Sequence, residues 1–366
     1  YILRFYLSYI YLQVIRRNRR MESRKIQRVG YSTFSVSLPI DWVRDLALKR
    51  GDLVMIFPEK DGSLRLIPSS MVERKTQVEE YVINSDLCNE PGMLERLIVG
   101  NYILGRDILK IVSSTRISRM HIDEVRKITH RLMGFGIVQE TPEQIDVQCS
   151  IDPTRFKIDM LMRRLSVIAS TIYTEAMQAL TESNLELAED AIRREDEADM
   201  MYWLSLRLLL SAQRDRTIGD KIGLDEPTQI LGYTLITRYL ELIADRAEYI
   251  ARRAIELQSH GREKASKQLM TKIANMGELT HNVFLKAMDC IFNGNIEVAN
   301  NLLEIARDIR SEHERLLKEV PELPTLRTVI LELNRIADHG SSIAVIAINK
   351  ALEKPSKICS VSNNRG

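Results

Sequence analysis

The sequence predicts a multidomain α+β protein in which a strand-rich amino-terminal unit and a small mixed unit precede a long all-α region. Residues 24–68 alternate like short strands and are broken by turn residues such as Gly30, Pro39 and Gly51. Residues 78–150 alternate between strand-like and helix-like patterns. After Pro153, apolar residues recur at spacings of three and four over long runs, which is typical of amphipathic helices.

Composition sets the broad class of the protein. A chain of 366 residues has room for two or three domains. The formal net charge is only +2, so a surface for nucleic acid would have to be local. The four cysteines lie far apart without CxxC spacing, which indicates neither a structural zinc site nor a disulfide framework. We therefore expect a cytoplasmic protein.

Both ends of the chain are expected to lie outside the fold. Residues 1–20 are apolar and aromatic, then basic, and the apolar run is shorter than the roughly 20 residues of a membrane span. The first methionine is Met21, so we interpret residues 1–20 as translated upstream sequence, with a membrane-surface anchor as the alternative. We expect no integral membrane insertion, and a disordered tail over residues 353–366.

Residues 21–72 read as one small strand-rich unit. A strand over 34–38 ends at Pro39, which begins a short helix over 40–48. A turn at Gly51 precedes a strand over 53–57, and a hairpin turn at Asp61-Gly62 leads to a return strand over 64–68. So short a unit buries little apolar surface, and pairing with a second copy would stabilise it.

This arrangement resembles the SpoVT-AbrB domain, a swapped-hairpin module. The resemblance implies a homodimer with interlocked hairpins, and most members bind DNA. One departure is that the family pattern Gly-x-(Val/Ile)-Thr-(Ile/Leu)-Pro reads here as Ser-Val-Ser-Leu-Pro over residues 35–39. Basic residues would contact promoter phosphates, although a pure dimerisation module is the alternative. The candidate DNA-binding residues are Arg24, Lys25, Arg28, Arg44, Lys49 and Arg50.

The middle segment, residues 78–150, predicts a βαβαββ unit. Its expected elements are strands over 78–84 and 105–114, helices over 91–104 and 120–136, and two final strands over 136–140 and 145–151. It shows no Gly-rich phosphate loop, Walker sequence or nucleophile–base pair. We interpret it as a structural spacer and expect no enzyme activity.

The carboxyl-terminal half predicts two tandem three-helix bundles, over residues 155–260 and 264–352. Expected helices span 155–182, 185–212 and 229–257, then 267–292, 297–319 and 326–352, with a break over 217–227. A phrase on the third helix of the first bundle, LELIADRAEYIA at 240–251, returns as LNRIADHGSSIA at 333–344. The repetition indicates two copies of one unit.

The repeated phrase places acids on one helix face. Glu241 and Asp245 are four residues apart, as are Glu195 and Asp199 on the preceding helix, so two helices can present four carboxylates together. Converging carboxylates repel unless a cation lies between them, and hard cations prefer oxygen ligands. Solvated helix faces also carry such pairs, and that is the simpler alternative.

The two phrases resemble the PhoU family motif Glu-Arg-Ile-x-Asp-His-x-x-Asn-Ile, and the resemblance covers about residues 155–352. It implies two three-helix bundles with surface metal clusters, of iron or zinc or alternatively manganese or magnesium. The second bundle departs from the pattern, since Asn334 precedes Asp338 where an acid is expected. The implied metal ligands are Glu195, Asp199, Glu241 and Asp245, and in a weaker second site Asp308, Glu312, Asn334 and Asp338.

Together the two resemblances imply a regulator that represses phosphate uptake, acting as a DNA-binding transcriptional regulator. The alternative is an adaptor that dimerises without DNA and binds the phosphate transporter ATPase or its sensor kinase. A di-iron carboxylate enzyme is disfavoured, because those sites use Glu-x-x-His pairs that neither third helix carries around its acid.

Overall fold

The computed structural model describes residues 22–58, 62–71, 79–260, 265–320, 322–353, 355 and 358–360. The chain divides into two compact units, residues 1–78 and 79–366. The predictions for residues 1–20 and for most of the tail after 353 lie outside the described residues.

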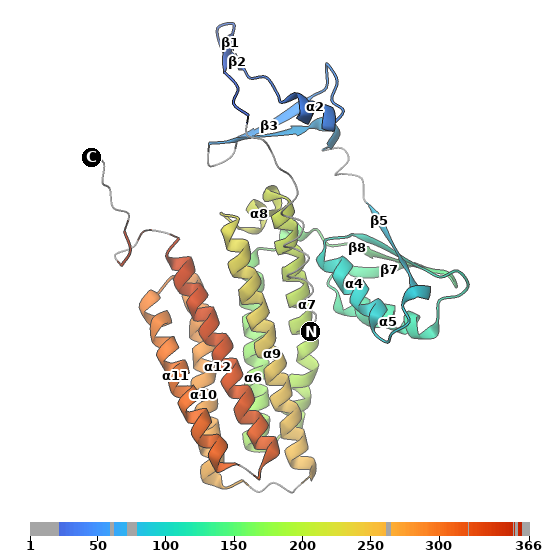
Figure 1. Cartoon of the computed structure of the whole chain (residues 1–366). Coiled ribbons are helices and arrows are strands. Elements are labelled where there is room, and N and C mark those ends of the chain that lie inside the picture. The colour runs from blue at the N-terminus through green and yellow to red at the C-terminus, as the bar shows by residue number, and fades with distance from the viewer. Residues whose placement is uncertain are drawn as a thin grey trace. The chain divides into compact units, whose positions relative to one another are not determined.

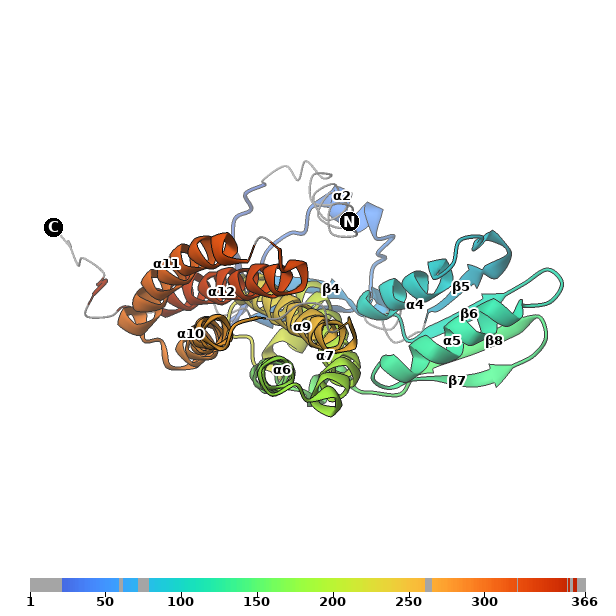
Figure 2. The same cartoon turned by 90° about the horizontal axis from the view of Figure 1, so that it is seen from below.

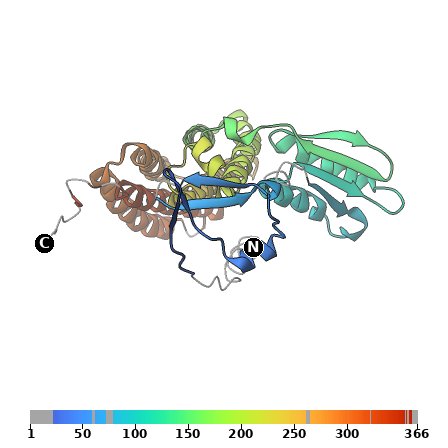
Figure 3. The ribbon, with the colours of Figure 1, turned by 90° about the horizontal axis from the view of Figure 1, so that it is seen from above.

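The described parts of the amino-terminal unit include two hairpins and the short helix α2 (Figures 1 and 3). β1 (Gln27–Val29) pairs antiparallel with β2 (Thr33–Ser35), and β3 (Val54–Pro58) pairs antiparallel with β4 (Leu64–Pro68). α2 (Ile40–Asp45) begins directly after Pro39. The first predicted strand was placed too late, since β2 ends at Ser35. The predicted helix over 40–48 was too long, because Ala47 adopts a left-handed φ of 50°.

This unit has almost no core of its own. Pro68 is the one buried residue in the parts of residues 22–71 that the structure describes. Large apolar side chains are exposed instead, among them Tyr31 at 97%, Phe34 at 68% and Leu53 at 74%. Two small hairpins that expose their apolar side chains are marginal as an isolated fold.

The middle domain confirms the predicted βαβαββ order. β5 (Glu80–Asn84) leads through a 3₁₀ turn, η1 (Ser85–Leu87), to α4 (Met93–Ile103), followed by β6 (Ile108–Val112) and α5 (Arg119–Arg131). β7 (Phe135–Glu140) and β8 (Gln144–Cys149) close it as a hairpin. The sheet order is β5-β6-β8-β7, with β5 and β6 parallel and the other pairs antiparallel.

Both helices of this domain cover the same face of its sheet (Figure 1). Side chains of alternate strand residues point towards them, so Leu109 and Ile111 of β6 and Ile145 and Val147 of β8 are fully buried. Tyr102 of α4 packs edge-on against Phe135, and its hydroxyl donates to the Met133 carbonyl at 3.0 Å. The domain therefore has its own complete core.

The helical region contains the six predicted long helices. After the 3₁₀ turn η2 (Pro153–Arg155) come α6 (Ile158–Glu182), α7 (Leu185–Arg214) and α9 (Thr228–His260). They are followed by α10 (Lys267–Asn293), α11 (Ile296–Glu319) and α12 (Pro324–Ala351). The predicted break over 217–227 was partly wrong, because it contains α8 (Arg216–Ile222). Asp215 caps α8 by accepting from Thr217 N, and Gly223 ends it at a φ of 92°.

The two three-helix units share one hydrophobic core rather than two. Buried residues of one continuous cluster come from all six long helices. α9 packs against α6 and α7 of its own unit and also against α12 of the other. The view along the helices shows α9 and α12 side by side in the middle (Figure 2). Within the described ranges, no helix has the length and apolar character needed to cross a bilayer.

The second helices of the two units align in sequence at a constant spacing. A spacing of 111 residues relates Asn184, which caps α7, to Asn295, which caps α11. The same spacing aligns the buried residues Ala188 and Ala191 of α7 with Ala299 and Leu302 of α11. On the third helices the repeated phrase shifts by 93 residues, from Asp245 to Asp338. The shorter spacing follows from the extra segment that carries α8 in the first unit.

Candidate functional site

The structure brings the four first-bundle carboxylates onto adjacent helices. Asn184 caps α7 and fixes where its turns begin, so Glu195 and Asp199 lie one turn apart on one face. Glu241 and Asp245 lie one turn apart on α9, which packs along α7. The acids on the two helices are close enough to repel one another electrostatically, Asp245 with both Glu195 and Asp199.

Burial and mutual repulsion raise the pKa of these acids. Loss of hydration is the main cause in each case, followed by a neighbouring carboxylate for Glu195 and Glu241. The pKa of Glu195 rises to about 7, that of Asp199 to about 6 and that of Glu241 to about 8. Burial also raises the pKa of Asp245. The four acids thus form one coupled group whose full ionisation is opposed at neutral pH.

Arginines accompany these acids. Arg131, the last residue of α5 in the middle domain, places Nη2 2.8 Å from Asp199 Oδ2 and 3.5 Å from Glu195 Oε2. Its Nε lies 2.8 Å from Asp196 Oδ1. Arg238, one turn before Glu241 on α9, forms an ion pair with that acid. We call Glu195, Asp199, Glu241 and Asp245 the first acid face. It contacts guanidinium groups from two domains.

The second bundle does not assemble the acids that the sequence suggested. Asp338 is paired with Arg310 of α11, whose Nη2 lies 2.6 Å from Oδ1. Asn334 Nδ2 donates to Asp338 Oδ2 at 3.3 Å. Glu312 pairs with Arg315 on its own helix, and Asp308 is exposed.

The chemistry of the donors, carboxylate oxygens, suits a hard cation. In the parts of the chain that the structure describes, no group of three or more His, Cys, Asp or Glu side chains is placed to hold a metal ion. The metal assignment of Glu195, Asp199, Glu241, Asp245 and the second set stays a prediction.

All six predicted DNA-binding residues are exposed on the amino-terminal unit. Arg24 pairs with Glu22, and Arg28 Nη2 donates to the Tyr31 carbonyl at 2.7 Å. Lys25, Arg44, Lys49 and Arg50 are also at the surface. Their exposure makes these side chains accessible to a polyanion.

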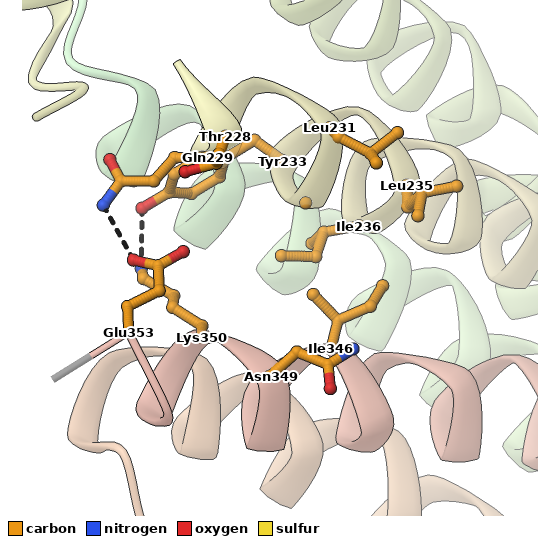
Figure 4. Close-up of a pocket in the computed structure, with 11 residues that line it drawn as sticks. Thr228, Gln229, Leu231, Tyr233, Leu235, Ile236, Ile346, Asn349, Lys350 and Glu353 are labelled. Atoms are coloured by element: carbon orange, nitrogen blue, oxygen red, sulfur yellow. Dashed lines mark hydrogen bonds between the residues drawn. The ribbon is translucent and has the colours of Figure 1, made fainter. Parts of the chain in front are cut away.

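A shallow cavity of about 190 Å³ lies between the start of α9 and the end of α12 (Figure 4). Lys350 Nζ donates to the Tyr233 hydroxyl at 2.7 Å, and that hydroxyl donates to Asp159. Gln229 Nε2 donates to Glu353 Oε2 at 3.1 Å. Four of the polar side chains at this cavity are thus paired, and most of the remaining lining is apolar.

Sequence patterns match one known family. The model of the PhoU domain matches residues 162–254 and 273–347, which are the two three-helix units. Both matched segments lie on the six long helices, and we call the two three-helix units the PhoU domains after this similarity. The structure is also similar to the crystal structure of PhoU from Pseudomonas aeruginosa, at 19% identity and a TM-score of 0.45, over 54% of this chain and 96% of that chain. No curated protein sequence matches this chain.

Sequence reasoning missed the arginines of the PhoU domains. Arg310 could have been found, because the 111-residue spacing that aligns α7 with α11 relates it to Asp199. Arg131 carries no such signal, since it reaches the first PhoU domain only through the docking of the middle domain.

Proposed function

We propose that this protein is a regulator of phosphate homeostasis that represses phosphate uptake. The observation that carries the proposal is the match of two PhoU domains over residues 162–254 and 273–347. In these units carboxylates pair with arginines, Asp199 with Arg131 and Asp338 with Arg310.

The amino-terminal unit supplies dimerisation in this proposal. Its exposed apolar side chains, including Phe34 and Leu53, need a second surface to cover them. A second copy of the same unit offers a complementary set, with interlocked hairpins as in the SpoVT-AbrB domain. The hairpins β1–β2 and β3–β4 are short enough to exchange between copies.

Binding to promoter DNA follows from the charge of that unit. Between Met21 and Arg50 there are six basic and three acidic residues, and a dimer doubles the excess. The six basic side chains are exposed. Lysine and arginine contacts to phosphates release counterions and make binding dependent on salt.

The experiment compares phosphate uptake and uptake-gene expression in cells with the parent protein, without it, and with an Arg24→Ala, Lys25→Ala, Arg28→Ala variant. Loss of repression without the protein supports the regulator, and unchanged uptake contradicts it. In vitro, the triple variant should bind promoter DNA more weakly and with a salt slope reduced by about 0.9 for each lost phosphate contact.

An adaptor without DNA binding is the second candidate. It is favoured if the triple variant represses as well as the parent while phosphate uptake still depends on the protein. In that case the PhoU domains would act by contacting the transporter ATPase or a sensor kinase.

A further inference from the structure

The carboxylates of α7 belong to a longer stripe of residues that faces the middle domain. The stripe continues at intervals of four from Asp199 through Trp203 to Arg207. Trp203 packs against the core of the middle domain. Arg207, only 3% exposed, donates through Nη1 to the Tyr102 carbonyl at 2.6 Å and also pairs with Asp107. The middle domain is thus docked along α7.

Arg131 continues this docking at the acid end of the stripe. Its guanidinium lies 5.3 Å from the centre of the Trp203 ring while it contacts Asp199 and Glu195. The side chain is 20% exposed, so it is held mainly by protein groups. A guanidinium offers a planar fork of donors to carboxylates and stays charged at every physiological pH.

The second PhoU domain has an arginine at the corresponding place without help from another domain. The spacing of 111 residues that relates the helix caps Asn184 and Asn295 also relates Asp199 to Arg310. Arg310 therefore stands where the first domain has an acid, and it pairs with Asp338, the counterpart of Asp245. The two units carry different sets of acids, yet an arginine forms an ion pair with an acid in each set.

We propose that arginines are the cations of both acid faces in this chain: Arg131 of the middle domain at the first face, and Arg310 at the second. The first acid face is then a docking surface for α5 of the middle domain rather than a metal cage. Arg131 acts as a positioning residue that joins the two domains, and Arg310 closes the second face within its own bundle. The inference needs only the PhoU fold and stands apart from the phosphate role.

A double-mutant cycle on the full chain tests the first half of the proposal. Arg131→Gln, Asp199→Asn and the double variant are melted in the presence of a chelator. Arg131→Gln should lower Tm by about 2 °C or more in the parent chain, and it should lower Tm clearly less in the Asp199→Asn background. Arg126→Gln is the matched control, because Arg126 lies on the same helix, pairs with Glu140 inside the middle domain and is 55% exposed. Losses that add up for Arg131 and Asp199 would overturn the proposal.

Trp203 gives a second readout that a purely structural loss would not mimic. The chain has two tryptophans, so in a Trp42→Phe background Trp203 alone reports on the guanidinium beside it. Arg131→Gln should shift its emission while Arg126→Gln leaves it unchanged. Identical emission from the parent and both variants contradicts the contact.

Metal analysis completes the test. The purified parent should contain less than stoichiometric iron, zinc or manganese, and its Tm should not respond to these ions or to magnesium. A stoichiometric metal that Asp199→Asn or Asp245→Asn releases would overturn the proposal and support the metal assignment instead. Repression of phosphate uptake in cells is a separate measurement. A failure of the arginine proposal therefore does not decide whether the proposed function is right.

Discussion

Arg246 of α9 forms an ion pair with Glu332 of α12, with 3.5 Å between Nη1 and Oε2. On the same two helices the rings of Tyr239 and His339 lie 5.7 Å apart. The 93-residue shift of the repeated phrase carries Tyr239 onto Glu332 and Arg246 onto His339. The Arg246–Glu332 contact and the Tyr239–His339 contact therefore occupy equivalent positions, with the roles of α9 and α12 exchanged. The two PhoU domains thus pack about an approximate two-fold axis.

Glu332→Gln should destabilise the helical region. Glu332 is 2% exposed and is paired with Arg246 and with Arg335, at 2.7 Å. Removing its charge weakens bonds that are worth about 1.5–3 kcal/mol when one partner is charged. We expect a loss of about 1–3 kcal/mol in the free energy of unfolding by urea. Glu304→Gln removes an exposed pair with Arg307 and should change it by less than about 0.5 kcal/mol. Equal losses of stability in the two variants would contradict a role for the ion pair between α9 and α12.

Gly340→Ala should also be destabilising, for a steric reason. A methyl group there would lie 3.0 Å from the backbone N and Cα of Phe284, so α12 would have to move away from α10. We expect a cost of about 1–3 kcal/mol. Gly232→Ala is the matched control in a helix, since its methyl group would lie 3.8 Å from Ile346, and it should stabilise by up to about 1 kcal/mol. Thermal unfolding of both variants gives the comparison.

Acidification should weaken the fold partly through His281. Its Nε2 lies 2.9 Å from the Ser170 hydroxyl, its ring stacks on Tyr173, and burial lowers its pKa. The folded state therefore favours the neutral ring, whereas the unfolded chain takes up the proton near pH 6.5. The contribution of His281 is full above about pH 6.5 and is lost as pH falls, by at most about 1.4 kcal/mol per pH unit. His281→Asn should flatten this slope between about pH 6.5 and 5, as measured by urea unfolding. Equal slopes in parent and variant would refute the assignment.

Removing the amino-terminal unit should change the oligomeric state. A chain that starts at Glu79 keeps the middle domain and both PhoU domains, with their own cores. We expect sedimentation to show a dimer for the full chain and a monomer for the shortened one. A shortened chain that still forms a dimer would move the interface to the PhoU or middle domain.

Helix and strand positions were largely predictable because periodicity reports burial directly. All six long helices and all six elements of the middle domain were confirmed. α8 was missed, since a seven-residue helix between Asp215 and Gly223 is too short to show a repeating apolar face. The single core of the PhoU pair was missed as well, because periodicity cannot say that α9 packs against another unit.

The candidate site was predictable only within each helix. The four-residue spacing placed Glu195 with Asp199, and Glu241 with Asp245, and tandem packing brought the two pairs together. The contacts of Arg131 with Asp199 and Trp203 depend on how the middle domain docks, which no local pattern encodes. The sequence could therefore identify the acids but could not identify their counterion.

The approximate two-fold relation between the PhoU domains also affects how mutations act on the molecule. In a symmetric homodimer every substitution occurs twice and strikes both halves of the interface at once. Here the halves are fused in one chain, so each substitution occurs once. That freedom allows Ser170 to face His281, and an arginine at 310 to stand where the other half has aspartate 199. Because the halves are fused, the second can carry its own arginine counterion while the first binds an arginine of the middle domain.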